Sequence, residues 1–91
     1  MAISLKRPRC VAVQARENYH LLVTFNNGEK RLYDAHWLLE RPGHAELKNP
    51  AVFAEVKPAG YSIAWLHGQD VSPVELYDRS IPYTETEAQN D

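Results

Sequence analysis

The sequence contains only one cysteine, Cys10, among its 91 residues, so no disulfide can form within the chain. A chain without disulfides is typical of a reducing compartment. The sequence also lacks an uninterrupted apolar run of about 18 residues, the length that a membrane-spanning helix needs. At the N-terminus the charged residues follow the short apolar part, which is the reverse of a secretory signal peptide. These absences predict a cytoplasmic protein that does not enter a membrane.

Charge of one sign is not in excess, because 12 Asp and Glu residues nearly balance 10 Lys and Arg residues. The formal net charge of −2 argues against nucleic acid as the main partner. Glycine is also scarce, and the four glycines are isolated positions that fit turns, so no phosphate-binding loop is present. Apolar residues make up 44% of the chain, which is enough for one modest core.

Metal-binding and catalytic patterns are missing as well. The chain has four histidines, with an aspartate close in sequence to two of them: His20, His36, His44 and His67, beside Asp34 and Asp70. None shows the i, i+4 pairing or the tight Cys/His spacing of a zinc site. The thiol of Cys10 lies at the start of a predicted strand, which suits a buried side chain better than a nucleophile. The sequence predicts no metal site, no cofactor and no enzymatic activity, and a hydrolase or metal site among the histidines is our least favoured hypothesis.

The most informative stretch is a predicted hairpin at residues 19–34, where two runs of β-branched and aromatic residues flank Asn27-Gly28. This dipeptide favours a two-residue type I′ turn, and that loop would place Val23 opposite Leu32. Side chains alternate between the two faces of a strand. The predicted register therefore places on one face Tyr19, Leu21, Val23, Phe25 and Leu32, and on the other His20, Leu22, Thr24, Arg31 and Tyr33.

The remaining signals predict one further strand before the hairpin and a mixture of short elements after it. Residues 10–16 and 61–66 read as strands, and residues 35–40 read as a short helix. Asn49 before Pro50 and Ser72 before Pro73 are typical helix starts. The sequence thus predicts an α+β fold: a small three- to four-stranded, mainly antiparallel sheet with an N-terminal β-hairpin and short helices packed on one face. Residues 1–9 are predicted to be loosely ordered, 10–83 to form a single domain, and 84–91 to be a disordered acidic tail.

Several short motifs occur in a specific order across nearly the whole predicted domain. They are Phe25-Asn26-Asn27-Gly28-Glu29, Tyr33-Asp34, Leu47, Asn49-Pro50, Phe53, Ile63-Ala64-Trp65, Gly68, Asp70, Ser72-Pro73 and Leu76-Tyr77. In this order and spacing the chain resembles the bacterial family of domains of unknown function numbered 2442 (DUF2442). The resemblance implies a small α+β domain with no established activity. Some members are fused to a helix-turn-helix, and others are encoded beside a second small family in pairs that look like toxin–antitoxin modules.

The face of the hairpin opposite the predicted core is expected to remain uncovered. Arginine and tyrosine are enriched at protein–protein interfaces, and this face is predicted to combine both with a leucine. We therefore predict a non-enzymatic protein-interaction domain that binds a small protein or a second copy of itself. The narrowest form of this prediction is the antitoxin-like partner in a bacterial two-gene module. The predicted partner-binding residues are Arg16, Leu22, Arg31 and Tyr33.

A second hypothesis uses the same predicted face differently. Basic residues beside an aromatic ring on an open sheet suit single-stranded nucleic acid, so the alternative is a nucleic-acid-binding adaptor that uses Arg16, Arg31 and Tyr33. No RNP-like aromatic pattern accompanies them, which makes this alternative the weaker one. Trp37 and Trp65 are predicted to lie in the core, and an exposed tryptophan would indicate an interface instead.

Overall fold

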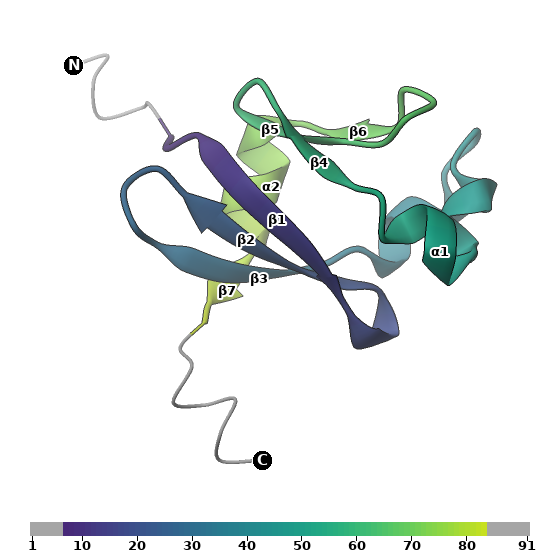
Figure 1. Ribbon diagram of the computed structural model, residues 1–91, viewed down its shortest axis with the longest axis horizontal. Helices are drawn as coiled ribbons and strands as arrows, with labels where there is room; N and C mark the ends of the chain where they lie inside the picture. The colour runs from purple at the N-terminus through teal and green to yellow at the C-terminus, as the bar shows by residue number, and fades with distance from the viewer. Residues whose placement is uncertain (1–6, 84–91) are drawn as a thin grey trace.

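The computed structural model describes residues 7–83, which contain two antiparallel sheets (Figure 1). The first sheet has the strand order β1-β2-β3-β7, made from β1 (Cys10–Arg16), β2 (His20–Phe25), β3 (Lys30–Asp34) and β7 (Ile81–Pro82). The second has the order β4-β5-β6, made from β4 (Lys57–Ala59), β5 (Ser62–Ala64) and β6 (Asp70–Val71). The predicted α+β fold with antiparallel pairing and an N-terminal hairpin is confirmed. In the second sheet, β5 lies within the predicted strand at 61–66 but is shorter. The sheet itself is an addition, because β4 and β6, of three and two residues, are too short to leave an alternating pattern in the sequence.

The helices are short and lie mainly between the sheets in sequence. Residues 7–83 contain two α-helices, α1 (Pro50–Phe53) and α2 (Pro73–Arg79), and three 3₁₀ helices, η2 (Glu17–Tyr19), η3 (His36–Glu40) and η4 (Ala45–Lys48). Both predicted caps are present: the side-chain oxygen of Asn49 accepts from the N–H of Ala51, and that of Ser72 accepts from the N–H of Glu75. Within residues 7–83, none of the helices is long and apolar enough to cross a membrane.

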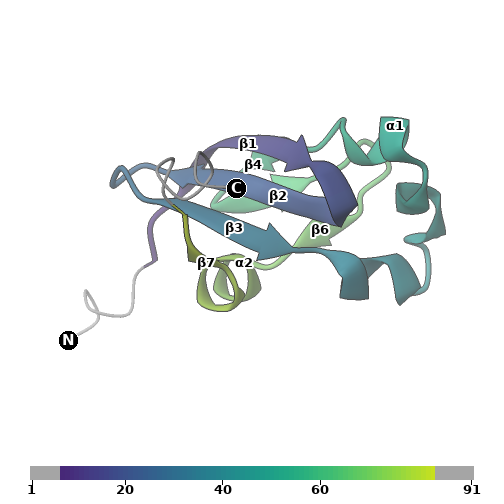
Figure 2. The same cartoon turned by 90° about the horizontal axis from the view of Figure 1, so that it is seen from below.

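The core lies between the first sheet and the elements that cover one of its faces, α2 and the second sheet (Figure 2). Leu21, Val23 and Phe25 on β2 point into it and are buried, as the sequence predicts. Trp65 is buried there too, and its Nε1–H donates to the carbonyl of Phe53 at 2.9 Å. The prediction for the other tryptophan is wrong, because Trp37 is 37% exposed.

The hairpin loop differs from its prediction by one residue. The N–H of Gly28 donates to the carbonyl of Phe25, and the N–H of Phe25 donates to the carbonyl of Glu29, both at 2.9 Å. The loop therefore contains three residues, Asn26, Asn27 and Gly28. Only Gly28 has a positive φ, at +93°, which matches a type I turn followed by a glycine bulge rather than a type I′ turn. The asparagine side chains favour this loop: that of Asn27 accepts from the N–H of Glu29 at 3.0 Å.

The longer loop moves every β3 side chain to the face opposite the predicted one. Leu21 pairs with Tyr33 and Val23 pairs with Arg31, so Tyr33 and Arg31 lie on the inner face of the sheet. Leu32 lies on the outer face. The predicted placement of these three residues is wrong, whereas the placement of the β2 side chains is confirmed.

Of the predicted terminal segments, 84–91 and residues 1–6 lie outside the described residues. The part of the N-terminal segment that the structure describes is held by polar contacts. Arg7 donates from two guanidinium nitrogens to the carboxylate of Asp78, at 3.0 and 2.8 Å. The backbone of Arg9 exchanges hydrogen bonds with Asn26 in the hairpin loop, at 3.0 and 2.8 Å.

We expect Gly28→Val to lower the free energy of unfolding by about 1–2 kcal/mol, because a β-branched residue is strained at positive φ. A Cβ at this position would meet no atom within 4 Å, so the effect would come from the backbone alone. Gly28→Asn is the matched control and should cost less, since asparagine tolerates this conformation. Urea titration measures both, and an unchanged midpoint for Gly28→Val would contradict the glycine-bulge loop.

Candidate functional site

The outer face of the first sheet carries an apolar row across three neighbouring strands. Leu22 on β2 lies opposite Leu32 on β3, and Leu32 lies opposite Ile81 on β7. Ile81 is 60% exposed, whereas the two leucines are partly buried. Among residues 7–83, no helix or strand lies over this face (Figure 2). The row is therefore available to a partner at its Ile81 end.

Rows that are mainly polar border the apolar row on both sides. At the end of the sheet away from the hairpin loop, which we call its open end, the bordering row is Arg16, His20 and Asp34. The row toward the hairpin loop is Ala12, Thr24 and Lys30. The guanidinium carbon of Arg16 lies 5.8 Å from the centroid of the Tyr83 ring. Arg16 is on one edge strand and Tyr83 follows the opposite edge strand, so this cation–π contact crosses the outer face above the apolar row.

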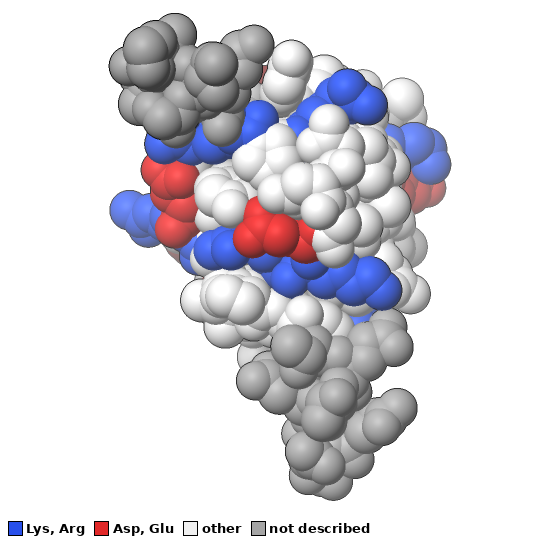
Figure 3. All heavy atoms as spheres, turned by 90° about the vertical axis from the view of Figure 1, so that its left-hand side faces the viewer, with Lys and Arg blue, Asp and Glu red and all other residues white. Residues whose placement is uncertain are grey.

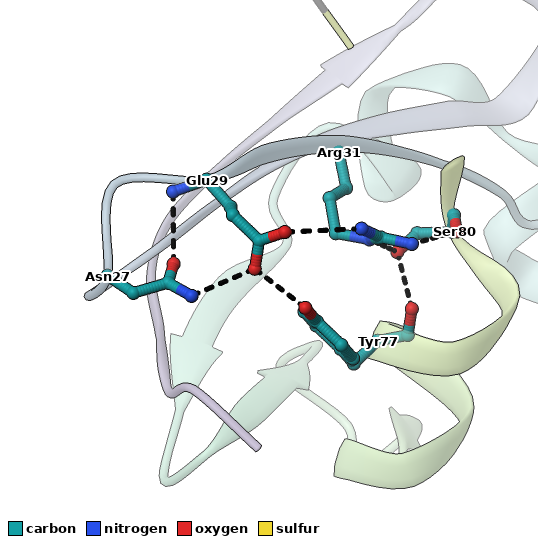
Figure 4. A network of polar contacts seen from close by, with 5 residues as sticks. All are labelled: Asn27, Glu29, Arg31, Tyr77 and Ser80. Carbon is teal, nitrogen blue, oxygen red and sulfur yellow. Dashed lines mark hydrogen bonds and ion pairs between the residues drawn. The ribbon is translucent and has the colours of Figure 1, made fainter. Parts of the chain in front are cut away.

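Arg31, a predicted partner-binding residue, points away from the outer face and joins the hairpin to the C-terminal helix (Figure 4). Its Nε and one terminal nitrogen donate to the hydroxyl and the carbonyl of Ser80, both at 2.7 Å. Its guanidinium carbon lies 4.5 Å from the ring centroid of Tyr77. The side chain is only 14% exposed, so its contacts are within the domain.

Glu29 completes this network. Its carboxylate accepts from the amide of Asn27 at 2.8 Å and from the hydroxyl of Tyr77 at 2.7 Å, and it pairs with Arg31 at 3.4 Å. These contacts lower the pKa of the Glu29 carboxyl, the hydrogen bond from Asn27 most of all. The network therefore connects the loop, β3 and α2, and it fixes the start of β7 immediately after Ser80.

Tyr33, another predicted partner-binding residue, is fully buried. Its hydroxyl accepts from Trp37 Nε1–H at 2.7 Å and donates to the carboxylate of Glu75 at 3.3 Å. Burial raises the pKa of the Tyr33 phenol well above its usual value. Of the four predicted residues, the structure therefore brings Arg16 and Leu22 to the outer face, and it places Arg31 and Tyr33 on the other side.

The sequence analysis missed Leu32 and Ile81 on the outer face. A two-residue loop would direct Leu32 into the core, whereas the observed three-residue loop turns it to the outer face. Ile81 carries no local signal, because its position depends on the pairing of β7 with β3, which lies far away in the sequence. A three-residue loop, Asn26-Asn27-Gly28, was the one sequence feature that could have corrected Leu32.

The structure also brings together three potential metal ligands, His20, Asp34 and His36, whose ligand atoms all lie within 4.8 Å of one another. The pKa of the Asp34 carboxyl is lowered, mainly because it accepts from the backbone N–H of His36. The other two histidines, His44 and His67, do not belong to this cluster. His67 Nδ1 is 2.7 Å from the carboxylate of Glu46, and His44 Nδ1 is 3.1 Å from the carbonyl of Pro42.

Charged side chains at the hairpin-loop end of the molecule are mixed in sign. Figure 3 shows acidic side chains lying between basic ones on this side. The structure also pairs Arg7 with Asp78, 2.8 Å apart, and this hydrogen-bonded contact lowers the pKa of the Asp78 carboxyl. A mixed surface gives a weaker field for a polyanion than an unbroken basic patch.

The thiol of Cys10 is buried at the start of β1. Its sulfur lies 3.3 Å from the carbonyl of Ala12, and burial raises the pKa of the thiol. A raised pKa reduces the fraction of thiolate, the nucleophilic form. The position therefore suits packing, as the sequence predicts.

Comparison with known proteins yields one family. The profile of the family described as "Protein of unknown function (DUF2442)" matches residues 10–82. No curated protein and no solved structure matches the chain.

Proposed function

Because this chain belongs to the DUF2442 family, whose function is unknown, we propose a role for it from its geometry. The proposed role is that of a non-enzymatic protein-interaction domain, whose outer face binds a small partner protein or a second copy of the chain. The observation that carries this proposal is the apolar row of Leu22, Leu32 and Ile81, over which no helix or strand of residues 7–83 lies and whose Ile81 end is 60% exposed. We place this function in the cytoplasm, because the single buried thiol fits a reducing compartment.

The arrangement of the face supports a protein partner. Protein interfaces have an apolar centre and a polar rim, and here mainly polar rows border the apolar row on both sides. Burial of the exposed Ile81 side chain by a partner would stabilise the complex, because burial of apolar surface contributes about 25 cal/mol per Å². Arg16 and Tyr83 add a rim of the residue types that are enriched at interfaces.

An antitoxin-like role, in which the outer face masks a small protein encoded beside it, is the narrowest form of the proposal. Support for this form comes from the resemblance to a family in which some members are encoded in pairs that look like toxin–antitoxin modules. The nucleic-acid-binding adaptor is the second candidate. It loses two of its three predicted residues, because Arg31 and Tyr33 bond to their own chain, and only Arg16 stays on the outer face.

The test compares wild type with Ile81→Asp, which places a charge in the apolar row without disturbing the core. Leu66→Asp is the matched control, since Leu66 is 81% exposed and belongs to the loop after β5. Light scattering over a range of concentrations detects a second copy. Immobilised protein with mass spectrometry detects a small partner in a lysate of the cells that encode the chain. Circular dichroism confirms that each variant is folded.

We expect Ile81→Asp to weaken the association at least about tenfold, which corresponds to about 1.4 kcal/mol, and Leu66→Asp to leave it intact. If Ile81→Asp keeps the mass of the wild type and captures the same proteins, the outer face is not the interface. Binding of an oligonucleotide that weakens steeply with salt would favour the second candidate instead.

A further inference from the structure

Two strands and a 3₁₀ helix bring His20, Asp34 and His36 to the open end of the outer face. His20 begins β2 and lies directly opposite Asp34, which ends β3, while His36 begins η3 two residues later. His20 Nε2 lies 3.8 Å from one carboxylate oxygen of Asp34, and His36 Nδ1 lies 2.6 Å from the other. From this arrangement we propose that the three side chains bind a divalent transition-metal ion of the zinc type.

The hydrogen bond of His20 supports this assignment. Its Nδ1 lies 2.9 Å from the carbonyl of Asn18, and a carbonyl can only accept, so Nδ1 carries the hydrogen. In the neutral ring the lone pair then belongs to Nε2, the atom that faces Asp34. Metal-binding histidines have this same outer hydrogen bond, which fixes the tautomer and the orientation of the ring. The carbonyl is held in place by the tight η2 turn, in which Asn18 and Tyr19 both have positive φ.

The second histidine is oriented by an aromatic neighbour. The ring of Tyr19 meets that of His36 edge-on, with centroids 5.8 Å apart, and the hydroxyl of Tyr19 donates to the carbonyl of Lys48. The two histidine rings are also edge-on to each other at 5.9 Å. Both imidazoles are therefore restrained near the same carboxylate.

The spacing of the ligand atoms suits a small ion. Zinc holds nitrogen and oxygen ligands at about 2.0–2.1 Å in a tetrahedron, so neighbouring ligand atoms lie about 3.3 Å apart. The observed 3.8 and 2.6 Å lie on either side of this spacing, and all three ligand atoms lie within 4.8 Å of one another, so no pair needs a shift of more than about 1.5 Å. The side chains of Asp34 and His36 are 61% and 47% exposed, which leaves them room to adjust. Three protein ligands leave a fourth position for water or for a group from a partner.

The competing explanation is a purely polar cluster. Asp34 already accepts from the backbone N–H of His36 at 3.0 Å, and its 2.6 Å contact with His36 Nδ1 could complete its role in the turn. The two explanations differ in a measurable way. Imidazole nitrogens suit zinc and related ions but not magnesium, so a metal site prefers Zn²⁺ over Mg²⁺, whereas a merely anionic cluster does not.

Isothermal titration of the full chain with Zn²⁺ tests the proposal, with Mg²⁺ as the control ion. We expect binding of one Zn²⁺ per chain and a higher thermal midpoint with Zn²⁺. His20→Gln, Asp34→Asn and His36→Gln should each weaken Zn²⁺ binding at least tenfold. His67→Gln is the matched control and should not, although it also removes a histidine from a carboxylate.

The proposal is overturned if wild type binds no Zn²⁺, if Mg²⁺ binds equally well, or if His67→Gln weakens binding as much as His36→Gln. Circular dichroism of each variant separates loss of a ligand from loss of the fold. The measurement needs no partner protein, so it is independent of the proposed function. Ile81→Asp should retain full Zn²⁺ binding even where it abolishes association.

Discussion

Leu21→Asp should unfold the domain, whereas Leu22→Asp should leave it folded. Leu21 is completely buried and lies opposite Ala15 and Tyr33, so an aspartate there would have no basic partner across the strands. Burial of an unpaired charge costs several kcal/mol, which is comparable to the whole stability of about 5–15 kcal/mol that small domains have. The side chain of Leu22 points to the uncovered face, where loss of cross-strand contacts costs under about 1 kcal/mol.

The pair is well matched, because the same substitution is made at adjacent residues of one strand. Circular dichroism at increasing urea concentrations measures both variants against wild type. If Leu22→Asp were the more damaging change, β2 would be displaced by one residue, and the outer and inner faces described above would have to be exchanged.

The alternation of β2 was visible in the sequence, and it sufficed to predict which face of the hairpin is buried. The loop was not determined by the same signal. Asn27-Gly28 suits a two-residue type I′ turn, but Asn26-Asn27-Gly28 equally suits a three-residue loop in which only the glycine needs positive φ. Local propensity does not choose between the two loops. The choice depends on the contacts that β3 makes with α2, which are distant in sequence.

The same one-residue difference decided what could be predicted of the candidate sites. In the predicted register Asp34 would lie opposite Leu21, so His20 and Asp34 would not meet, and the histidines looked unrelated. In the observed register they are direct cross-strand neighbours. Arg16 and Leu22 were placed correctly because both precede the loop, whereas Arg31 and Tyr33 follow it.

Arg31 connects the hairpin to the C-terminal helix, and we expect its removal to have the second largest effect. Two nitrogens of its planar guanidinium donate to Ser80, and the same group lies over the ring of Tyr77. Arg31→Ala would leave the buried carbonyl of Ser80 without this donor and the Glu29 carboxylate without its nearest cation. We expect the free energy of unfolding to fall by about 2–4 kcal/mol.

Arg31→Lys should lower the free energy of unfolding by at least about half as much as Arg31→Ala does. A single ammonium cannot form both bonds to Ser80 or stack on the ring of Tyr77. The matched control is Arg79→Lys, since Arg79 is 67% exposed and its ion pair with Glu75 should contribute under about 1 kcal/mol. Urea titration measures all three variants. Ser80 directly precedes Ile81, so the Arg31 variants should also loosen β7 and weaken any association through the outer face. If Arg31→Lys were as stable as wild type, the charge of Arg31 and not its two-nitrogen geometry would hold β7 in place.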